Sequence, residues 1–596
     1  MVYIQKNTPP PNKIMDFTQN VFSGGLNNQS NILEPFEASY LINMVFSTDE
    51  VMDKRYGSVV FDAVNVANLI NPVVFIDEYK PYNSTDVLLR ATSSKLYADG
   101  VEIYTVNGQI SGENYNGKYY FSDGSGLYAY GIFHQTTTTY TKVIGTPITT
   151  HIVTKTVSPP VDYFPLDTSH VRGVTVVDYN INQVWYEPCQ KELEDTHKGA
   201  NVVPDNIKYI VTHGGRLFAS GDNDDDDNVF ISDVQNPYYF AVILPIQLPP
   251  NSDNVVGLVV YDDSVVVGRN DDIYAINGLT NRANEGVPLF TLRKLNTHTG
   301  FANNKSINVV HNFLFFLGSD GNAYAISSAK QSESILSTQL ISKQIDLFKD
   351  PISFTNTEIR GAVSYFHDDI WYVSIQDKVL LYSYRHVAWS MFKGLNMRSL
   401  YKLNDELIWG DTNGDVVKFS NDYLDQGVPF IAEWHSKNFD MDTSITFKHF
   451  REFFLVSHVF NELSSDIRVL FQVDHSDIKD EIIVSNQISR WGISSFGDRF
   501  ITRNINASFP FVIGRRGRYI KIILKNSYDV QDTVYTTSDL DFVTGLVDGS
   551  TLVYVSQDNT YYLYKESAWH LMSNIDLNQP MRVYEINGEY ELRGKR

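Results

Sequence analysis

From about residue 72 to residue 425 the sequence repeats one short pattern. Runs of four to seven β-branched and aromatic residues alternate with polar turns of Asp, Asn and Gly. Clear examples are VVGLVVYDDSVVVGRNDDIYAING, NVVHNFLFFLGSDGNAYAIS and ELIWGDTNGDVVKFS. Asp-Gly or Asn-Gly between apolar runs is a strong hairpin signal. Because strands of this kind repeat with such short turns, the sequence predicts an all-β protein built from antiparallel hairpins.

The spacing of the repeats favours a β-propeller. Residues 72–425 number 354, and removing the 63 residues of 144–206, a Thr- and Pro-rich stretch that looks like an insertion, leaves 291. At roughly 42 residues for each four-stranded blade, this gives about seven blades, with six or eight also compatible. Two or three β-sandwiches in series are the alternative, since strand alternation is common to both architectures. The insertion is expected either to reach outward to a neighbour or to form an extra layer.

Three further regions flank the predicted propeller. Residues 1–71 are expected to form an N-terminal arm that reaches an adjacent protein, with one short helix in FEASYLINM after Pro35. Longer strands predict a β-sandwich over residues 430–528. Residues 529–596 are expected to form a small β unit that ends in a hairpin turning at Asn587-Gly588.

Composition limits the function. The 70 Asp and Glu residues outnumber the 48 Lys and Arg, so the formal charge is −22, and a protein that grips phosphates is not expected. This negative charge is compatible with an acidic wall past which DNA slides without binding. The single Cys189 cannot form an intrachain disulfide, which favours folding in a reducing cytoplasm. The first residues lack a signal-peptide core, and no apolar run is long enough for a membrane span.

The sequence predicts no catalytic, cofactor-binding or metal-binding site. It contains no HExxH, GxSxG or Walker motif. The acidic run of Asp222, Asp224, Asp225, Asp226 and Asp227 could hold Ca²⁺, but a solvated hairpin tip is favoured. DTNGD at 411–415 is interpreted as a turn because Val416 occupies the position that a calcium loop reserves for Gly. A glycosidase could use two of the many carboxylates, although the Asp-box of sialidase blades is absent.

Two surface features have alternative interpretations. The basic cluster GRRGRYIK at 514–521 could face DNA phosphates or an acidic neighbour, or it could be a strand with solvent-facing Arg side chains. Aromatic strands such as WYVSI and VYVSQDNTYYLY could stack on glycans, but packing between sheets or at subunit contacts is favoured.

The N-terminal segment resembles that of many phage virion proteins, in which a Gly-Gly-Leu, a Glu-Ala and an Arg-x-Gly follow in order. Here they are Gly24-Gly25-Leu26, Glu37-Ala38 and Arg55-Tyr56-Gly57. A second stretch resembles the most recognisable blade of the same family, through Arg216, Gly221, Ser232-Asp233 and Asn236-Pro237. These residues are typical of turns and blades, and none of them suggests a reaction.

The family comprises the nozzle or hub proteins of short-tailed bacteriophages, some of them described as packaged-DNA stabilisation proteins. The resemblance implies a structural virion protein made in the host cytoplasm. As the family's pattern implies, it would form a homo-oligomeric ring of six copies around the DNA conduit for genome retention and ejection. Its partners would be other copies, the adaptor or portal side, fibres and passing double-stranded DNA. The alternatives are a receptor- or polysaccharide-binding tail-tip protein and, with less support, a glycan-cleaving enzyme.

Overall fold

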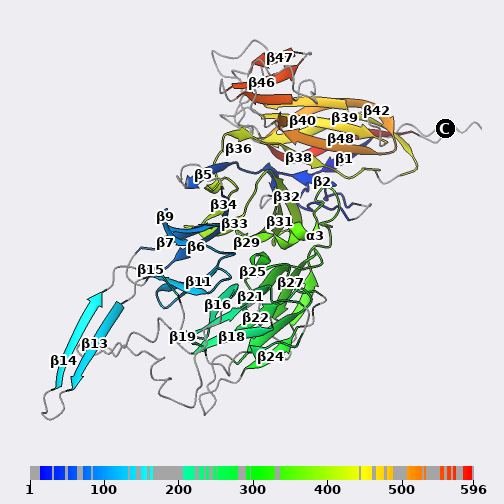
Figure 1. Ribbon diagram of the computed structural model, residues 1–596. Coiled ribbons are helices and arrows are strands. Elements are labelled where there is room, and N and C mark those ends of the chain that lie inside the picture. The colour runs from blue at the N-terminus through cyan, green and yellow to red at the C-terminus, as the bar shows by residue number, and fades with distance from the viewer. Residues whose placement is uncertain are drawn as a thin grey trace, which may run out of the picture.

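A computed structural model of the protein (Figure 1) describes the following residues: 14–29, 33–46, 51–62, 71–81, 85–131, 134–142, 149–157, 161–165, 206–221, 227–233, 236–240, 246–250, 253–278, 290–295, 297, 299–328, 336–441, 444–458, 465–474, 480–486, 506–526, 529–531, 551–555, 560–565, 568–571 and 581–593. In these ranges the protein is almost entirely β, which confirms the predicted all-β class. The only helical elements described are α3 (Asn356–Arg360) and the 3₁₀ turn η1 (Asn304–Ser306).

Seven sheets, antiparallel except for one parallel strand pair in the last, follow one another along the described chain from Val73 to Phe419, and we number them 1 to 7. Sheet 1 contains β6 (Val73–Tyr79), β7 (Val87–Thr92), β8 (Lys95–Ala98) and β9 (Val101–Thr105). Sheet 2 contains β10 (Ser111–Tyr115), β11 (Lys118–Ser122), β12 (Leu127–Gly131) and β15 (Val161–Pro165). Sheet 3 contains β16 (Tyr209–His213), β17 (Arg216–Ser220), β18 (Asn228–Asp233), β19 (Asn236–Phe240) and β20 (Ile246–Gln247).

The next four sheets repeat the same up-and-down order. Sheet 4 contains β21 (Gly257–Tyr261), β22 (Ser264–Gly268), β23 (Ile273–Asn277) and β24 (Thr291–Lys294). Sheet 5 contains β25 (Ile307–Val310), β26 (Phe313–Leu317), β27 (Ala323–Ser328) and β28 (Leu336–Leu340). Sheet 6 contains β29 (Val363–His367), β30 (Ile370–Ile375), β31 (Lys378–Ser383) and β32 (Ala388–Lys393). Sheet 7 contains β33 (Ser399–Leu403), β34 (Glu406–Gly410), β35 (Val416–Phe419), β5 (Ser58–Asp62), β36 (Leu424–Asp425) and β37 (Val428–Pro429).

Neighbouring sheets are joined through their first strands. β10 contacts β16, and contacts continue in order through β21, β25, β29 and β33, while β33 of sheet 7 contacts β6 of sheet 1. Between sheets 1 and 2, the Tyr79 hydroxyl donates to the Gly117 carbonyl at 2.9 Å, and the Asn114 amide donates to the Glu78 carbonyl at 2.7 Å. Apolar side chains of successive sheets fill the space between them, as in the cluster of Phe218, Val229, Leu258 and Val267.

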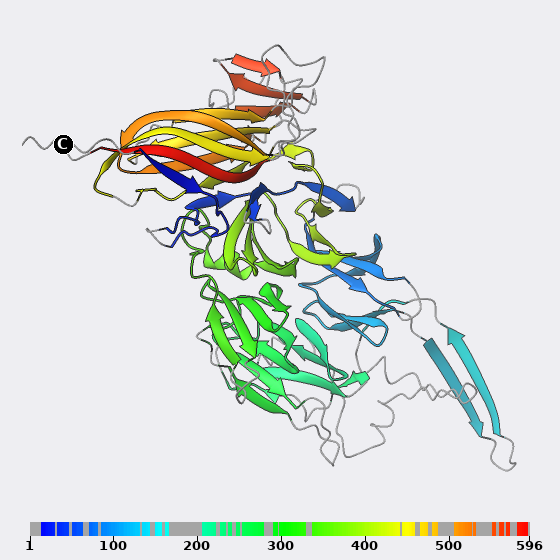
Figure 2. The ribbon, with the colours of Figure 1, turned by 180° about the vertical axis from the view of Figure 1, so that it is seen from behind.

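A β-sandwich lies beyond sheets 6 and 7 (Figures 1 and 2). Its sheet 8 contains β1 (Ile14–Gln19), β3 (Met44–Phe46), β4 (Met52–Lys54), β39 (Phe447–His458), β42 (Asn506–Gly517) and β48 (Arg582–Arg593). Sheet 9 contains β2 (Tyr40–Ile42), β38 (Ala432–His435), β40 (Ser465–Val473), β41 (Asp480–Asn486) and β43 (Ile520–Asn526). Phe471 of sheet 9 meets Phe511 of sheet 8 with ring centroids 5.0 Å apart, so aromatic side chains bind the two sheets together.

The N-terminal region differs from the expected arm. In its described part, β1, β3 and β4 lie in sheet 8, β2 lies in sheet 9, and β5 lies in sheet 7. The helix predicted in FEASYLINM is wrong, because this segment forms β2 and β3, with Asn43 at φ 55° between them. A nine-residue helix has little stability of its own. Pairing of β2 with β38 and of β3 with β4 satisfies the backbone instead, and it buries Leu41 and Met44.

The C-terminal region is divided differently from the expectation. β44 (Asp529–Gln531), β45 (Thr551–Val555), β46 (Thr560–Lys565) and β47 (Ala568–Leu571) form a separate sheet 10. β48, however, lies inside the sandwich, paired with β39 on one side and with β1 and β4 on the other. The predicted hairpin turn at Asn587-Gly588 is wrong, because the strand runs straight through both residues. Gly588 is required there because a Cβ atom would lie 2.5 Å from the Phe453 ring.

The predicted insertion at 144–206 also has different boundaries. β13 (His134–Lys142) and β14 (Thr149–Val157) form a two-stranded hairpin between β12 and β15. β15 then pairs with β12, so residues 161–165 complete sheet 2. The remaining part, 166–205, lies outside the described residues.

Candidate functional site: the N-terminal joint

The residues singled out near the N-terminus meet at one place, between sheet 6, sheet 7 and the sandwich. We call this place the N-terminal joint and define it by Gly24–Leu26, Glu37, Arg55 and Gly57 with their partners. Its apolar core is continuous with the sandwich and with sheet 6. Phe22 contacts Trp434 of sheet 9, with ring centroids 5.4 Å apart, and the same apolar cluster includes Trp389 of sheet 6.

Gly25 and Leu26 fasten the segment to sheet 6. The Leu26 N–H donates to the Trp389 carbonyl at 2.7 Å, and Leu26 is fully buried. Gly25 has φ +76°, and a Cβ atom there would lie 2.5 Å from the Trp389 carbonyl oxygen. Only glycine meets both demands without strain. Gly25 and Leu26 of the motif are therefore explained by close backbone contact with β32.

Glu37 holds the folded segment together from inside. Its carboxylate accepts hydrogen bonds from the Asn27 side chain at 2.9 Å, from the Glu34 backbone N–H at 2.9 Å and from the Gln344 side chain at 3.3 Å. A buried carboxylate is tolerated when donors of this kind compensate for lost water. Because Gln344 follows sheet 5, Glu37 also links the segment to that sheet.

Arg55 is the centre of the joint, with a side chain only 1% exposed. Its two terminal nitrogens donate to the two oxygens of Asp425 at 2.8 and 2.5 Å, and Nε donates to the Asn43 side-chain oxygen at 2.9 Å. The guanidinium lies 3.7 Å from the centroid of the Phe430 ring. Bidentate pairing and stacking on an aromatic face are properties that Lys cannot reproduce.

Gly57 and β5 follow directly. The Gly57 N–H donates to the Asp422 carbonyl at 2.7 Å, and a Cβ atom at this position would lie 2.0 Å from the Leu424 carbonyl oxygen. β5 then pairs antiparallel with β35 and becomes the fourth strand of sheet 7. The Arg-x-Gly motif thus places the strand that completes the last of the seven sheets.

Lys54 extends the joint into the sandwich. It is almost fully buried, and its amine donates to the Asn526 side-chain oxygen at 3.0 Å on β43. Burial, together with the neighbouring Arg55 cation, lowers the pKa of Lys54 to about 7. This hydrogen bond fixes the N-terminal segment to the sandwich.

The second family-like stretch also has a structural role. Arg216 is buried and donates to the Ser232 carbonyl at 2.8 Å, while the Leu217 N–H donates to the Ser232 hydroxyl at 2.8 Å. Gly221 lies at φ +88°. The backbones of Asp233 and Asn236-Pro237 lie in β18 and β19, and their side chains lie outside the described residues. The described part of the motif holds adjacent strands of sheet 3 together.

The calcium hypothesis concerns mostly undescribed residues. Asp222, Asp224, Asp225 and Asp226 lie outside the described ranges. Asp227 is described, and its carboxylate pairs with the buried guanidinium of Arg269, which also donates to the Pro249 carbonyl at 2.9 Å. Among the side chains that the structure describes, no group of three or more His, Cys, Asp or Glu could hold a metal ion. Asp227 therefore serves a contact between sheets 3 and 4.

The predicted turn at 411–415 is confirmed. It connects β34 with β35, and the Asp411 carboxylate accepts the N–H groups of Asn413 at 2.8 Å and Asp415 at 2.9 Å. Gly414 has φ +93°. Short polar side chains that bond nearby backbone groups stabilise such turns.

The basic cluster lies at the end of β42 and the start of β43. Arg515, Arg516 and Arg518 are exposed, and the Arg518 guanidinium lies 4.9 Å from the Phe447 ring centroid. Lys448 below them is buried and donates to the Arg518 carbonyl at 2.9 Å. This exposed position is compatible with DNA phosphates, with an acidic neighbour and with a solvent-facing strand.

Sequence analysis missed a pair of carboxylates on the first strands of sheets 1 and 2. Burial raises the pKa of Asp77 to about 6, although a hydrogen bond from the Tyr119 hydroxyl opposes the shift. Burial, assisted by Asp77, raises the pKa of Glu113 to about 7. No motif could have revealed them, because their burial results from contact between strands of different sheets.

Replacing Glu113 by Gln is expected to stabilise the protein at pH 8. Between about pH 4.5 and pH 7 the unfolded chain loses a proton that the folded chain keeps, so wild-type stability falls as pH rises through this window. Gln has no carboxyl group to ionise, so the variant does not lose stability in this way. Above pH 7 its free energy of unfolding should exceed that of the wild type by on the order of 2 kcal/mol. Urea unfolding at pH 4 and pH 8 measures it. Equal effects at both pH values would contradict the assignment.

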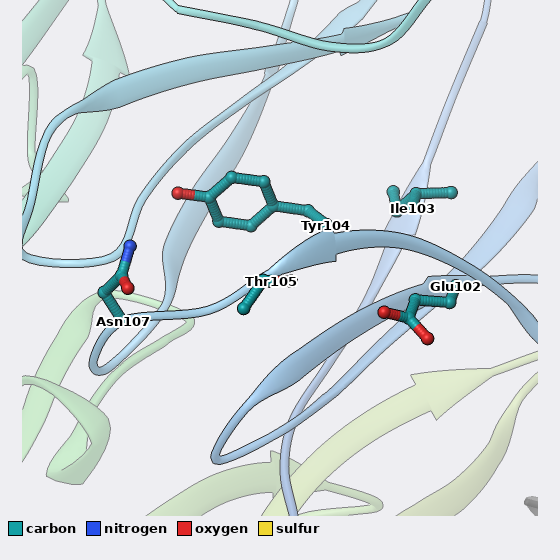
Figure 3. A pocket seen from close by; sticks show the side chains of 5 residues that line it. All are labelled: Glu102, Ile103, Tyr104, Thr105 and Asn107. Carbon is teal, nitrogen blue, oxygen red and sulfur yellow. The ribbon is translucent and has the colours of Figure 1, made fainter.

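A surface pocket of about 560 Å³ lies along β9 (Figure 3) and is lined by Glu102, Ile103, Tyr104, Thr105 and Asn107. The Tyr104 hydroxyl donates to the Asp123 carboxylate at 3.0 Å, and the Asn107 backbone N–H donates to the same oxygen at 3.0 Å. Two of the lining residues thus hydrogen-bond to Asp123, which follows β11, so the pocket lies at the contact between sheets 1 and 2.

No family model and no curated protein matches the sequence. Similar solved structures include the computationally designed Ika8 protein, with 9% identity over 60% of this chain and 100% of the other, at a TM-score of 0.31. The N-terminal domain of Nup159 is 9% identical, with 93% of this chain and 100% of that one covered, at a TM-score of 0.26. An exo-β-1,3-galactanase from Phanerochaete chrysosporium is 10% identical, with 81% of this chain and 96% of that one covered, at a TM-score of 0.19. These TM-scores are too low to support an argument about fold or function.

In the described ranges, no helix is long and apolar enough to cross a membrane.

Proposed function

We propose that sheets 1 to 7 are the seven blades of a β-propeller. The series of contacts between first strands, from β10 to β33 and on to β6, supports this arrangement. A further contact supports a common axis: the Lys305 amine, from the turn before sheet 5, donates to the Val74 carbonyl of sheet 1 at 2.8 Å. Sheets 1 and 5 are not neighbours in the series, so their first strands must converge.

The observation that carries the functional proposal is the completion of sheet 7 by β5. A strand that precedes sheet 1 in the sequence pairs with the last sheet, which ties the two ends of the propeller region together. The Arg55–Asp425 pair and the Lys54–Asn526 hydrogen bond then fasten this closure to the sandwich. Such a body is a stiff wedge, which suits a mechanical component better than a catalyst with moving parts.

The function we propose is that of a structural virion protein, a nozzle or hub subunit in the tail of a short-tailed bacteriophage. Copies would form a closed ring around the DNA conduit, retain the genome and let it pass on ejection. A net charge of −22 would keep phosphates from adhering to the wall. Neighbouring tail proteins and fibres would be its other partners. The resemblance of Gly24–Leu26, Glu37-Ala38 and Arg55–Gly57 to phage virion proteins supports this role.

The full chain is expected to form rings. A hexamer, six times the 67.8 kDa subunit, would have a mass of about 407 kDa. Native mass spectrometry and negative-stain imaging of the purified protein test this at several concentrations. A protein that stays monomeric at every concentration, and binds host cells instead, would favour a receptor-binding tip. Shortened host glycans after incubation would favour an enzyme.

A further inference from the structure

The β13–β14 hairpin stands apart from the rest of the molecule. Its strands pair from His134↔Val157 to Lys142↔Thr149, and Figures 1 and 2 both show it projecting away from the seven sheets. It leaves and rejoins sheet 2 at one point, because Gly131 of β12 pairs with Val161 of β15. The hairpin can therefore reach outward without disturbing its parent sheet.

An isolated two-stranded hairpin is marginally stable in water. No third strand in the described part of the chain pairs with β13 or β14. Nine of the 18 strand residues are Thr, and Ile152, Val153 and Val157 are also β-branched, which gives high strand propensity. Edge strands that avoid pairing normally carry blunting charges or Pro. These two strands contain no Pro, and Lys142 and Lys155 are their only Lys residues.

The charge of the hairpin is opposite to that of the chain. Residues 132–161 contain no Asp or Glu, whereas Lys142, Lys155, His134 and His151 lie on the two strands. The whole chain carries a formal charge of −22. A second copy of this chain is therefore an electrostatically complementary partner. Double-stranded DNA is also negatively charged, but it has no peptide backbone with which an edge strand could pair.

We propose that the β13–β14 hairpin docks on a neighbouring copy of this chain, where it adds its strands to an open sheet edge and places Lys142 and Lys155 against acidic side chains. This inference rests on the proposed ring, in which it supplies the contact between subunits. Each copy provides one hairpin and one acceptor surface, and such head-to-tail contacts close into a ring when the rotation permits.

The decisive variant replaces residues 132–160 with a short Gly-Ser linker that joins Gly131 to Val161. Because these two residues are already paired, sheet 2 should stay intact and the melting temperature of the body should not change. The ring should disappear, and the variant should sediment as a monomer at concentrations where the full chain assembles.

Charge variants refine the test. Lys142→Glu with Lys155→Glu should raise the concentration needed for assembly at least tenfold, while Lys142→Arg with Lys155→Arg, the matched control, should assemble normally. Zero-length carbodiimide crosslinking of mixed isotope-labelled and unlabelled subunits should join these lysines to acidic residues of the other subunit. If the deletion variant forms the same ring as the full chain, this inference fails and the proposed function stands. If the full chain forms no ring, both fail.

Discussion

Replacing Arg55 by Met is expected to destabilise the protein by about 3–5 kcal/mol, because it leaves the Asp425 carboxylate without its bidentate partner in a mostly buried position. Arg55→Lys should recover only part of this loss, since an ammonium cannot match both carboxylate oxygens or stack equally well on Phe430. Urea unfolding followed by tryptophan fluorescence measures the effect, because Trp409 lies in sheet 7.

Two controls separate the buried pair from ordinary charge effects. Lys402→Met removes an exposed ion pair with Asp405 in the same sheet and should leave the unfolding midpoint almost unchanged. Arg55→Met combined with Asp425→Leu should restore much of the stability, because no buried charge is then left unpaired. If Arg55→Met unfolds at the wild-type midpoint, the joint does not have the importance assigned to it here.

Gly57→Ala is expected to have the second large effect, a loss of more than about 4 kcal/mol. The added methyl group would lie 2.0 Å from the Leu424 carbonyl oxygen, and relief requires movement of the backbone of β36 or β5. β5 should detach from β35, so hydrogen exchange at Val59 and Val60 should accelerate before exchange elsewhere in sheet 7.

Gly126→Ala is the matched control for this substitution. Gly126 also lies in a turn next to a strand, but a Cβ atom there would meet nothing nearer than the Tyr128 hydroxyl at 3.4 Å, which is ordinary contact. It should unfold like the wild type. Equal stability of both variants would show that the close approach at Gly57 is not a constraint.

Local sequence patterns predicted the features that local interactions determine. Alternating apolar residues predicted the strands, and the turn at 411–415 lies where its Asp and Gly residues placed it. Two of the errors, a helix in FEASYLINM and a turn at Asn587-Gly588, have a common cause. In both segments, pairing with distant strands overrides the local preference.

The candidate site could be predicted only in part. A resemblance to phage virion proteins drew attention to Glu37, Arg55 and Gly57, but nothing local identifies their partners Gln344, Asp425 and Leu424, which lie more than 300 residues away. No sequence motif or resemblance pointed to Lys54 or Glu113. A buried charge is visible only when the surrounding elements are in place, since its environment comes from several sheets.

The position of β48 in the sandwich has a consequence for biosynthesis. The strand at 582–593 pairs with β39 on one side and with β1 on the other. The residues of β1 precede this strand by more than 560 positions. The seven sheets can form while translation is still in progress, but the sandwich stays open until the ribosome has released residue 593. A newly made chain therefore completes its sandwich only after synthesis has passed this point.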